Sequence, residues 1–408
     1  MSHAASLATI ATINENIVLS MLRRRPDGMS RVEIARETQL SAQTVSNVSR
    51  RLLERGLVRE IGNRSPGGPG KPAVILQSDP DGAYAVGVHL DPGLITCVLL
   101  DFCGTPVAQS HHLPPPSGVA RDTMDVITEA VGGLLKSSGR SLEDVLGIGV
   151  AAPGPIDTEE GALIRPRLAP GWAGLHLAQL LEEQFGRPSL LAKDVTAAVL
   201  AEHWVRPTTE HPHQAFLYWG AGVGVGLMLD GHVHEGASSN AGDVGHAIVD
   251  PDGPICECGR RGCFGELLRP FRMVLEGLRT GALPAPAGWD GGTDTGSALS
   301  AREVDQLFRM LWSAAELGNP AAVAVVERAL RGAHLYVSNL VALLDVDQIV
   351  LGGPSWEPMR AIFLPALADL GTANGRTVHV RESAFGGEVA AVGAACLVFQ
   401  SAFAPSGR

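Results

Sequence analysis

Residues 240–263 read NAGDVGHAIVDPDGPICECGRRGC and hold four residues that can bind a metal ion. His246, Cys256, Cys258 and Cys263 place one imidazole and three thiols within 18 residues, on a stretch kinked by glycines. Three thiolates and one imidazole form a closed tetrahedral set that is typical of structural zinc, without the open position of a catalytic site. We therefore expect one structural zinc ion per chain. Three buried free cysteines, or a redox switch that uses the same thiols, are the alternatives.

Outward from this stretch, apolar runs typical of buried strands alternate with segments expected to be helical. The clearest apolar runs are 84–90, 95–101, 145–150, 215–219, 223–231 and 345–353. Strands that alternate with helices predict an α/β body. No short internal repeat is visible in the sequence.

The first 78 residues follow a different pattern. Apolar spacing predicts a helix over 11–22, and Ser30 with Glu33 forms a capping box that starts a second helix. Ser41 caps a third helix that runs to about Arg55, followed by strands at 57–61 and 73–76 around a loop rich in glycine and proline. Three short helices and a hairpin predict a winged helix-turn-helix, although short helical triplets also occur without a DNA-binding role.

The third helix and the hairpin loop carry the polar and basic side chains that a DNA-binding domain needs. The helix capped by Ser41 is expected to enter the major groove, and the loop to approach the adjacent minor groove or backbone. The candidate DNA-binding residues are Ser41, Gln43, Thr44, Ser46, Asn47, Arg50, Arg64 and Lys71. The alternative for each of them is a solvated surface residue.

Charge is divided unevenly along the 408 residues. Residues 1–76 carry a balance of +5, whereas the rest of the chain carries −16. This asymmetry favours contact with double-stranded DNA at the N-terminal end only, because phosphates would repel the acidic body. The longest apolar stretch, 389–399, is shorter than the ~18 residues of a membrane span, and the start of the chain has no signal-peptide pattern. We therefore expect a cytoplasmic protein with no membrane partner.

The zinc stretch and several glycine loops resemble the signature of the ROK family (repressors, open reading frames and kinases). The matching segments are 149–157, 219–226, 240–246, 256–263 and 349–353. With its winged helix, the chain resembles the family's repressor branch, which includes regulators of glucose, xylose and N-acetylglucosamine. The resemblance implies a two-lobed actin-like (ribonuclease H-like) ROK domain, and assembly as a homodimer or homotetramer.

The expected domains follow from this resemblance. Residues 1–78 would form the winged helix-turn-helix. Residues 79–193 would form the first α/β lobe, completed by a C-terminal helix at 388–400, and residues 194–387 the second lobe with the zinc knuckle.

The first hairpin of the body bears on catalysis. Family kinases hold ATP phosphates there with the sequence Asp-x-Gly-Gly-Thr, whose backbone N–H groups bind the anion. In this chain the hairpin reads His89-Leu90-Asp91-Pro92-Gly93. Pro92 lacks an N–H group, Asp91 adds a negative charge, and the Thr hydroxyl is missing. We therefore predict no catalytic residue and no phosphoryl transfer, although Asp194 stands where family kinases keep their catalytic base.

The resemblance places a ligand between the lobes, near Gly154, Lys193, Asp194, Asp243 and His246. Asp194 and His246 fit the family pattern. The family has Asn at the place of Lys193, Glu at the place of Asp243, and Glu at the place of Gly265, where this chain moves its Glu one position to Glu266. Two interpretations stay open. Either Lys193 binds an anionic ligand such as a sugar phosphate or sugar acid, or it pairs with Asp194 or Asp243 and fills a site that no longer binds sugar.

Together these features predict a sequence-specific transcriptional regulator of carbohydrate metabolism, and favour a repressor over an activator. Its partners would be double-stranded operator DNA and a small carbohydrate-like effector bound in a degenerate kinase cleft. Two alternatives stay open: an ATP-dependent sugar kinase with a fused DNA-binding domain, and a ligand-independent DNA-binding protein that responds to zinc or redox state.

Overall fold

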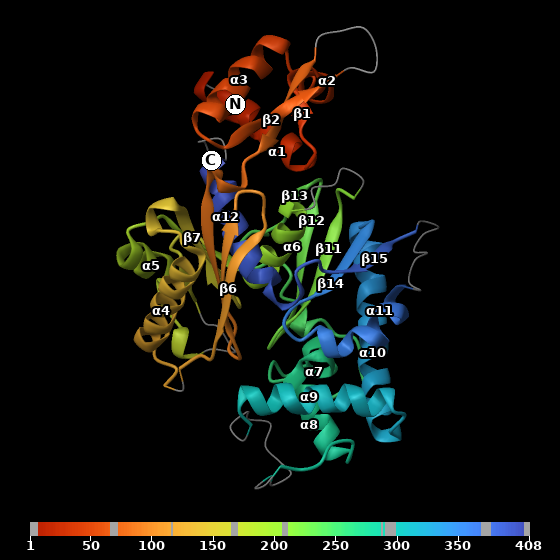
Figure 1. Cartoon of the computed structure of the whole chain (residues 1–408). Helices are drawn as coiled ribbons and strands as arrows, with labels where there is room; N and C mark the ends of the chain where they lie inside the picture. The colour runs from red at the N-terminus through yellow and green to blue at the C-terminus, as the bar shows by residue number, and fades with distance from the viewer. Residues whose placement is uncertain are drawn as a thin grey trace.

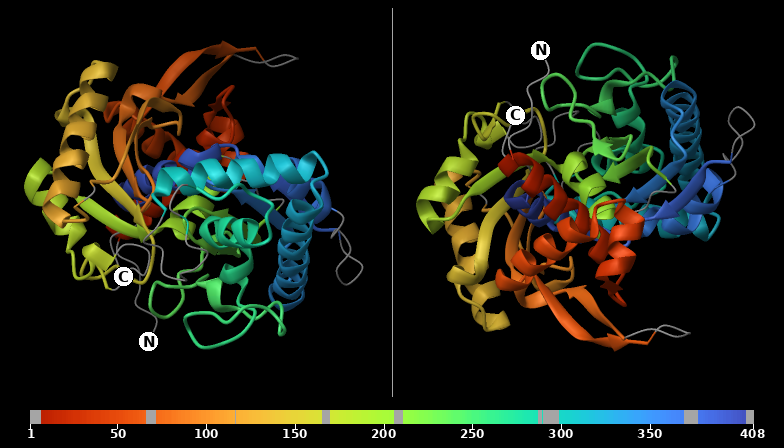
Figure 2. Two further views of the ribbon diagram at one scale, coloured as in Figure 1. Left: turned by 90° about the horizontal axis from the view of Figure 1, so that it is seen from below. Right: turned by 90° about the horizontal axis from the view of Figure 1, so that it is seen from above.

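A small N-terminal domain stands at one end of a larger body made of two lobes (Figure 1). The C-terminal helix runs through the body toward that domain (Figures 1 and 2). This computed structural model describes residues 7–65, 72–115, 117–164, 170–205, 211–286, 289, 299–368 and 377–403.

The N-terminal domain is a winged helix-turn-helix, as predicted. Its elements are α1 (Leu7–Arg23), β1 (Met29–Ser30), α2 (Arg31–Thr38), α3 (Ala42–Glu54), β2 (Val58–Arg64) and β3 (Ala73–Ser78). The three strands form a sheet in the order β1-β3-β2. β1 was not expected, because a run of two residues carries no periodicity that could indicate a strand. Most of the predicted loop 62–72, with Lys71, lies outside the described residues.

Side-chain caps fix where the second and third helices begin. The Ser30 hydroxyl accepts a hydrogen bond from the Glu33 backbone N–H at 3.2 Å, and the Glu33 carboxylate accepts from the Ser30 N–H at 2.7 Å. Ser41 caps α3 by accepting from the Thr44 N–H at 3.1 Å. These bonds satisfy N–H groups that a helix start leaves without partners. Both predicted helix starts are therefore confirmed.

The first lobe is a five-stranded sheet in the order β10-β7-β4-β5-β6, with β4, β7 and β10 parallel and β4, β5 and β6 antiparallel. Its strands are β4 (Tyr84–Leu90), β5 (Ile95–Asp101), β6 (Pro106–His112), β7 (Val145–Ala152) and β10 (Ser189–Lys193). Helices α4 (Ala120–Ser138) and α5 (Leu177–Phe185) cover one face, and α12 (Val389–Phe403) covers the other. A small hairpin, β8 (Ile156–Asp157) and β9 (Ala162–Leu163), follows β7.

The second lobe repeats this strand order as β13-β12-β11-β14-β15. Its strands are β11 (Gln214–Trp219), β12 (Val223–Leu229), β13 (His232–Val233), β14 (Gln348–Gly352) and β15 (His379–Glu382). One face packs on α6 (Asp194–Val205). The other face packs on a helical group made of α7 (Phe264–Leu268), α8 (Pro270–Arg279), α9 (Ala301–Glu316), α10 (Pro320–Leu344) and α11 (Arg360–Ala368). The two lobes thus share one topology, which the sequence did not reveal.

Helices α6 and α12 pack directly against each other between the two sheets. Gly393 of α12 approaches the Ala197 carbonyl of α6 so closely that a Cβ at position 393 would lie 1.7 Å from that oxygen. By length and composition the window Gly386–Phe403 could cross a membrane, but 61% of it is buried inside the protein. α12 is therefore a core helix that joins the lobes.

Candidate functional site

The stretch that carries the predicted metal ligands folds into a compact knuckle. The Cys256 N–H donates to the Arg260 carbonyl at 2.8 Å, and the Gly259 N–H donates back to the Cys256 carbonyl at 2.8 Å. Gly262 has a φ of +64°, and a Cβ there would lie 1.5 Å from the Asp250 carbonyl oxygen. Only glycine fits this position, because both the left-handed backbone and the close approach exclude a side chain. The turn brings Cys256, Cys258 and Cys263 to one side.

His246 completes this group, so the four predicted ligands lie together. One donor atom from each of His246, Cys256, Cys258 and Cys263 lies within 4.8 Å of the others. The Cys256 sulfur is 3.4 Å from His246 Nδ1, and the Cys258 and Cys263 sulfurs are 3.6 Å apart. Sulfurs on a tetrahedral ion with bonds of about 2.3 Å are separated by a similar distance. The arrangement could therefore hold a metal ion.

The five predicted ligand-binding residues line one cleft between the lobes. Loop residue Gly154 and the end of β10 contribute from the first lobe, and the start of α6 and the 3-10 turn Val244–His246 contribute from the second. The predicted residues in the cleft are Gly154, Lys193, Asp194, Asp243 and His246. His246 thus belongs to both the metal cluster and the cleft wall.

Lys193 is buried in this cleft and points its ammonium group at backbone oxygens. Its Nζ lies 3.4 Å from the carbonyl oxygens of Asn240 and Ala241, and the residue is 6% exposed. Among the described residues it forms no ion pair with Asp194 or Asp243. The pairing that would fill the site is therefore not formed in this structure.

Asp194 begins α6 beside Lys193 and is held by local contacts. Its carboxylate accepts a hydrogen bond from the Val195 N–H at 2.8 Å. Burial raises the pKa of Asp194 to about 7, the carboxylates of Asp91 and Asp243 add to this, and Lys193 opposes it. The group can therefore accept a hydrogen bond when ionised and donate one when protonated, near neutral pH.

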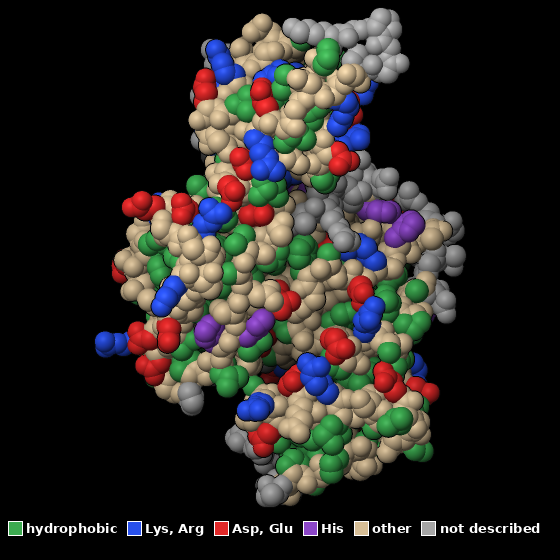
Figure 3. Space-filling model, in the orientation of Figure 1, with side chains coloured by type: hydrophobic (Ala, Val, Ile, Leu, Met, Phe, Trp, Pro, Cys, Tyr) green, Lys and Arg blue, Asp and Glu red, His purple; other side chains and the backbone are tan. Residues whose placement is uncertain are grey.

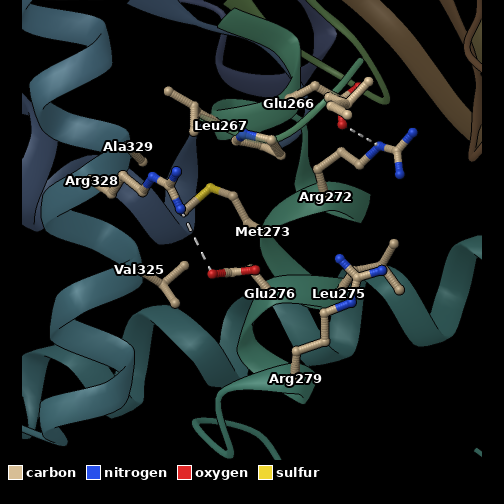
Figure 4. Close-up of a pocket in the computed structure, with 12 residues that line it drawn as sticks. Glu266, Leu267, Arg272, Met273, Leu275, Glu276, Arg279, Val325, Arg328 and Ala329 are labelled. Carbon is tan, nitrogen blue, oxygen red and sulfur yellow. Dashed lines mark ion pairs between the residues drawn. The ribbon is translucent and has the colours of Figure 1, made fainter. Parts of the chain in front are cut away.

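Two charged residues in the cleft were missed by the sequence analysis, Glu257 and Arg269. Arg269 pairs with Glu266 at 2.9 Å and approaches Glu257 to 3.9 Å. Glu266 itself lines a neighbouring pocket between α7, α8 and α10, where it also pairs with Arg272 at 2.9 Å (Figure 4). Glu266, which is shifted by one position from the family pattern, thus pairs with Arg269, whose side chain lines the cleft.

The hairpin after β4 carries a carboxylate across the gap between the lobes. Asp91 accepts from its own hairpin, through the Gly93 N–H at 2.8 Å, and from the second lobe, through the Ala221 N–H at 3.0 Å. Behind it, His89 Nε2 and the Tyr218 hydroxyl are 3.1 Å apart and also join the two lobes. The Asp91 side chain thus binds a backbone N–H of the glycine-rich loop that follows β11.

The outward face of α3 presents most of the predicted DNA-binding residues. Gln43, Ser46 and Arg50 are exposed, whereas Thr44 and Asn47 are half-buried. The opposite face is buried through Val45, Val48, Ser49 and Leu52, which pack into the domain core. Gln43 donates to Asn47 at 3.2 Å, and the hydroxyls of Ser41 and Thr44 are 2.8 Å apart. Ser41 and Thr44 are therefore engaged in capping the helix.

Arg64, the predicted wing residue, is held within its own domain. It donates to the Asp27 carbonyl at 3.1 Å and lies 3.5 Å from the Glu33 carboxylate. Basic and acidic side chains are both visible on the face of this domain in Figure 3, rather than one continuous basic patch. Sequence position alone could not predict this, because the partners of Arg64 lie more than 30 residues away.

Comparison with known proteins identifies the body. Residues 86–401 match the model of the ROK family, and residues 12–67 match that of the MarR family. The chain belongs to the ROK family. The MarR-type match covers the helix-turn-helix and β2 of the N-terminal domain, and β3 completes the wing in the structure, so both parts of the predicted fold are confirmed.

Among the relatives of this ROK protein is the xylose repressor of Bacillus spizizenii, which is 27% identical over 66% of this chain and 69% of the repressor. The DNA-binding transcriptional dual regulator NagC of Escherichia coli is 25% identical over 83% of this chain and 80% of NagC. A crystal structure of a ROK family transcriptional regulator, a homologue of the E. coli MLC protein, covers 97% of this chain and 98% of its own, with a TM-score of 0.74 and 21% identity. This last likeness extends over the winged helix and both lobes.

Proposed function

We propose that this ROK protein is a sequence-specific transcriptional repressor of genes for carbohydrate metabolism, controlled by a small ligand in the cleft. The observation that carries the proposal is that one chain combines two parts. One is a capped α3 with an exposed polar face, and the other is a two-lobed body whose cleft is lined by Asp194 and His246. The names of the xylose repressor and NagC support it, because both describe transcriptional regulators. Operator DNA and a carbohydrate-like effector would be its partners, and the cytoplasm its compartment.

The alternative of a sugar kinase is disfavoured by the hairpin at Asp91. Its carboxylate already accepts the Ala221 N–H, a donor that a phosphate group would otherwise need. A phosphate placed there would meet a buried negative charge, and Pro92 supplies no N–H to compensate. The cleft is therefore proposed to bind a ligand without phosphoryl transfer.

The metal cluster is proposed to hold one zinc ion with a structural role. Three sulfurs and one imidazole suit zinc and leave no position open for a reacting water. Since Nδ1 of His246 faces the cysteine sulfurs, Nε2 is the ring nitrogen that a ligand in the cleft would contact. The zinc would thus hold one wall of the cleft in place.

The cleft favours an effector with an acidic group. The Lys193 ammonium is buried and, within the described part of the chain, donates to two carbonyl oxygens at 3.4 Å without forming an ion pair, so a ligand carboxylate or phosphate would give it a counter-charge. Asp194 would accept a hydrogen bond from a ligand hydroxyl. A sugar acid or a sugar phosphate supplies both features.

The function is tested with DNA selected by the full-length protein from a randomised double-stranded library. We expect a two-fold sequence to be enriched, because the family resemblance implies a dimer or tetramer. Asn47→Ala with Arg50→Ala should weaken binding by about 1–3 kcal/mol for each interaction with a base that the substitutions remove. The control Arg331→Ala, at an exposed position of α10, should bind like the wild type. Selection of no sequence, or unchanged affinity of the double variant in a gel-shift titration, would refute the proposal.

A further inference from the structure

The N-terminal domain rests on the body through two arginines, each placed over an aromatic ring. Arg23, the last residue of α1, has its guanidinium carbon 3.6 Å from the centroid of the Trp204 ring. Arg55, which caps the C-terminal end of α3, has its guanidinium carbon 5.5 Å from the centroid of Phe403. Both distances fall within the range of a cation–π interaction. Arg55 also pairs with Glu15 of α1 at 2.8 Å, which fixes its guanidinium within the N-terminal domain. The two ring contacts therefore join that domain to the body at two separate points.

The two rings belong to helices of different lobes. Trp204 lies near the end of α6, and Glu202 anchors that end of α6 to the second lobe. The Glu202 carboxylate accepts from Arg381 at 2.6 Å, from the Ser383 hydroxyl at 2.7 Å and from the Ala384 N–H at 2.9 Å. Phe403 ends α12, which packs on strands β4 and β7 of the first lobe. The N-terminal domain thus stands across the boundary between the lobes.

Helix α6 also reaches the ligand cleft directly. Its first residue is Asp194 in the cleft, and Trp204 lies ten positions further along. A helix rises 1.5 Å per residue, so about 15 Å of rigid backbone join the cleft to the ring under Arg23. Trp204 also stacks on Phe399 of α12, with ring centroids 5.9 Å apart. A rotation of one lobe against the other that moves Trp204 relative to Phe403 must therefore shift this stack as well.

The contact at Arg23 leaves space for such a movement. A cavity of about 1040 Å³ lies beside it, lined by residues of α1, α6 and α12 and by first-lobe residues such as Glu160 and Leu191. The Arg23 Nε atom has no hydrogen-bond partner among the described residues, although it is shielded from solvent. The guanidinium is therefore held by the Trp204 ring without an acceptor at Nε that would fix its position.

We propose that Arg23 on Trp204 and Arg55 on Phe403 couple the lobes to the DNA-binding domain, one contact for each lobe. Movement of the lobes then changes the angle at which α3 is presented to DNA. This inference rests on the proposed function, since it needs a protein that binds DNA. By thermodynamic reciprocity, DNA bound to α3 must in turn bias the arrangement of the cleft.

The test uses this reciprocity and needs no effector. Backbone hydrogen exchange of the full-length protein is measured with and without the DNA that it selects. In the wild type we expect DNA to change exchange in cleft segments 194–200 and 240–246. In Arg23→Gln with Arg55→Gln we expect DNA to bind but this response to be lost. Arg140→Gln is the matched control, because it removes an arginine 4.5 Å above the Tyr84 ring in the first lobe.

The outcomes separate the two proposals. If no DNA is selected, the proposed function fails. If DNA binds the wild type but the cleft segments do not respond, or if the double variant responds like the wild type, the coupling is wrong. If the double variant does not bind DNA, the hydrogen-exchange response to DNA is measured in Arg23→Gln alone, because this variant leaves Arg55 and α3 unchanged. We expect at least half of the response to be lost in that single variant.

Discussion

At the scale of single residues, Cys258 gives the most direct test of the metal cluster. It is the half-buried corner of the group, whereas Cys256 and Cys263 are buried. Cys258→Ser keeps the size of the side chain but removes a soft ligand, so we expect loss of stoichiometric zinc in metal analysis. Structural zinc contributes on the order of 10 kcal/mol in small peptides, so we also expect a lower melting temperature. Cys103→Ser, outside the cluster, should keep its metal, and a Cys258→Ser protein with one zinc per chain would refute the assignment.

Asp194 predicts a pH dependence of stability. In the unfolded chain its pKa is near 3.8, whereas in the folded protein burial and the nearby Asp91 and Asp243 raise it to about 7. Between these values the folded state binds a proton that the unfolded state has released, so this group's stabilising contribution is lost as pH rises toward 7. Asp194→Asn should remove this slope, measured as free energies of urea unfolding between about pH 5 and about pH 8. The exposed variant Asp305→Asn should keep the wild-type slope; equal slopes in all three proteins would contradict the prediction.

The clustering of His246, Cys256, Cys258 and Cys263 could be predicted from the sequence because all four lie in one short stretch with glycine turns between them. The charged residues of the cleft could be predicted only in part. Asp194 was found because it fits the family pattern, and Lys193 because it stands where the family has Asn, but Arg269 was missed. Its side chain reaches the cleft from the start of α8 and is held there by Glu266 and Glu257. No local sequence pattern predicts that the Arg269 side chain enters the cleft, because its position depends on how α7 and α8 pack.

At the scale of elements, the packing around two helical glycines predicts opposite effects on stability when each is replaced by alanine: Gly393 lies at the crossing of α6 and α12, whereas Gly132 lies on the open side of α4. Gly393→Ala would place a Cβ 1.7 Å from the Ala197 carbonyl oxygen, so the two helices would have to move apart. We expect destabilisation of about 1–3 kcal/mol or more, as for other overpacked cores. Gly132→Ala, at an exposed position of α4 where a Cβ would have nothing within 4 Å, should stabilise by roughly 0.5–1 kcal/mol through helix propensity. Thermal unfolding measures both, and a neutral Gly393→Ala would contradict the close packing of α6 on α12.

Elements with local signals were predicted well. Ser30, Ser41 and the apolar faces behind them fixed the helix-turn-helix, because capping and periodicity act within a few residues. The repeated order of β4–β10 and β11–β15 was not predicted. Buried strands of both lobes are apolar on both faces, so their sequences do not distinguish which strand pairs with which.

At the scale of the whole molecule, the winged helix, α6 and α12 share one hydrophobic core with both sheets. Leu19 and Val48 of the N-terminal domain pack into the same cluster as Trp204 and Phe399 of the body. The N-terminal domain is therefore not a loosely tethered module. A change in the arrangement of the lobes must alter either this shared core or the position of α3.

This continuity predicts a measurable coupling free energy between binding of the effector and binding of DNA. A thermal-shift screen of sugars, sugar acids and sugar phosphates would first identify a compound that binds. If that compound weakens DNA binding ~100-fold, the coupling free energy is about 2.7 kcal/mol, and DNA must weaken binding of the compound by the same factor. Calorimetry with and without the selected DNA measures this directly. Asp194→Ala should lose affinity for the compound yet keep DNA affinity, because α3 is unchanged. Equal affinity for the compound in both conditions would show that the cleft does not control the DNA-binding domain.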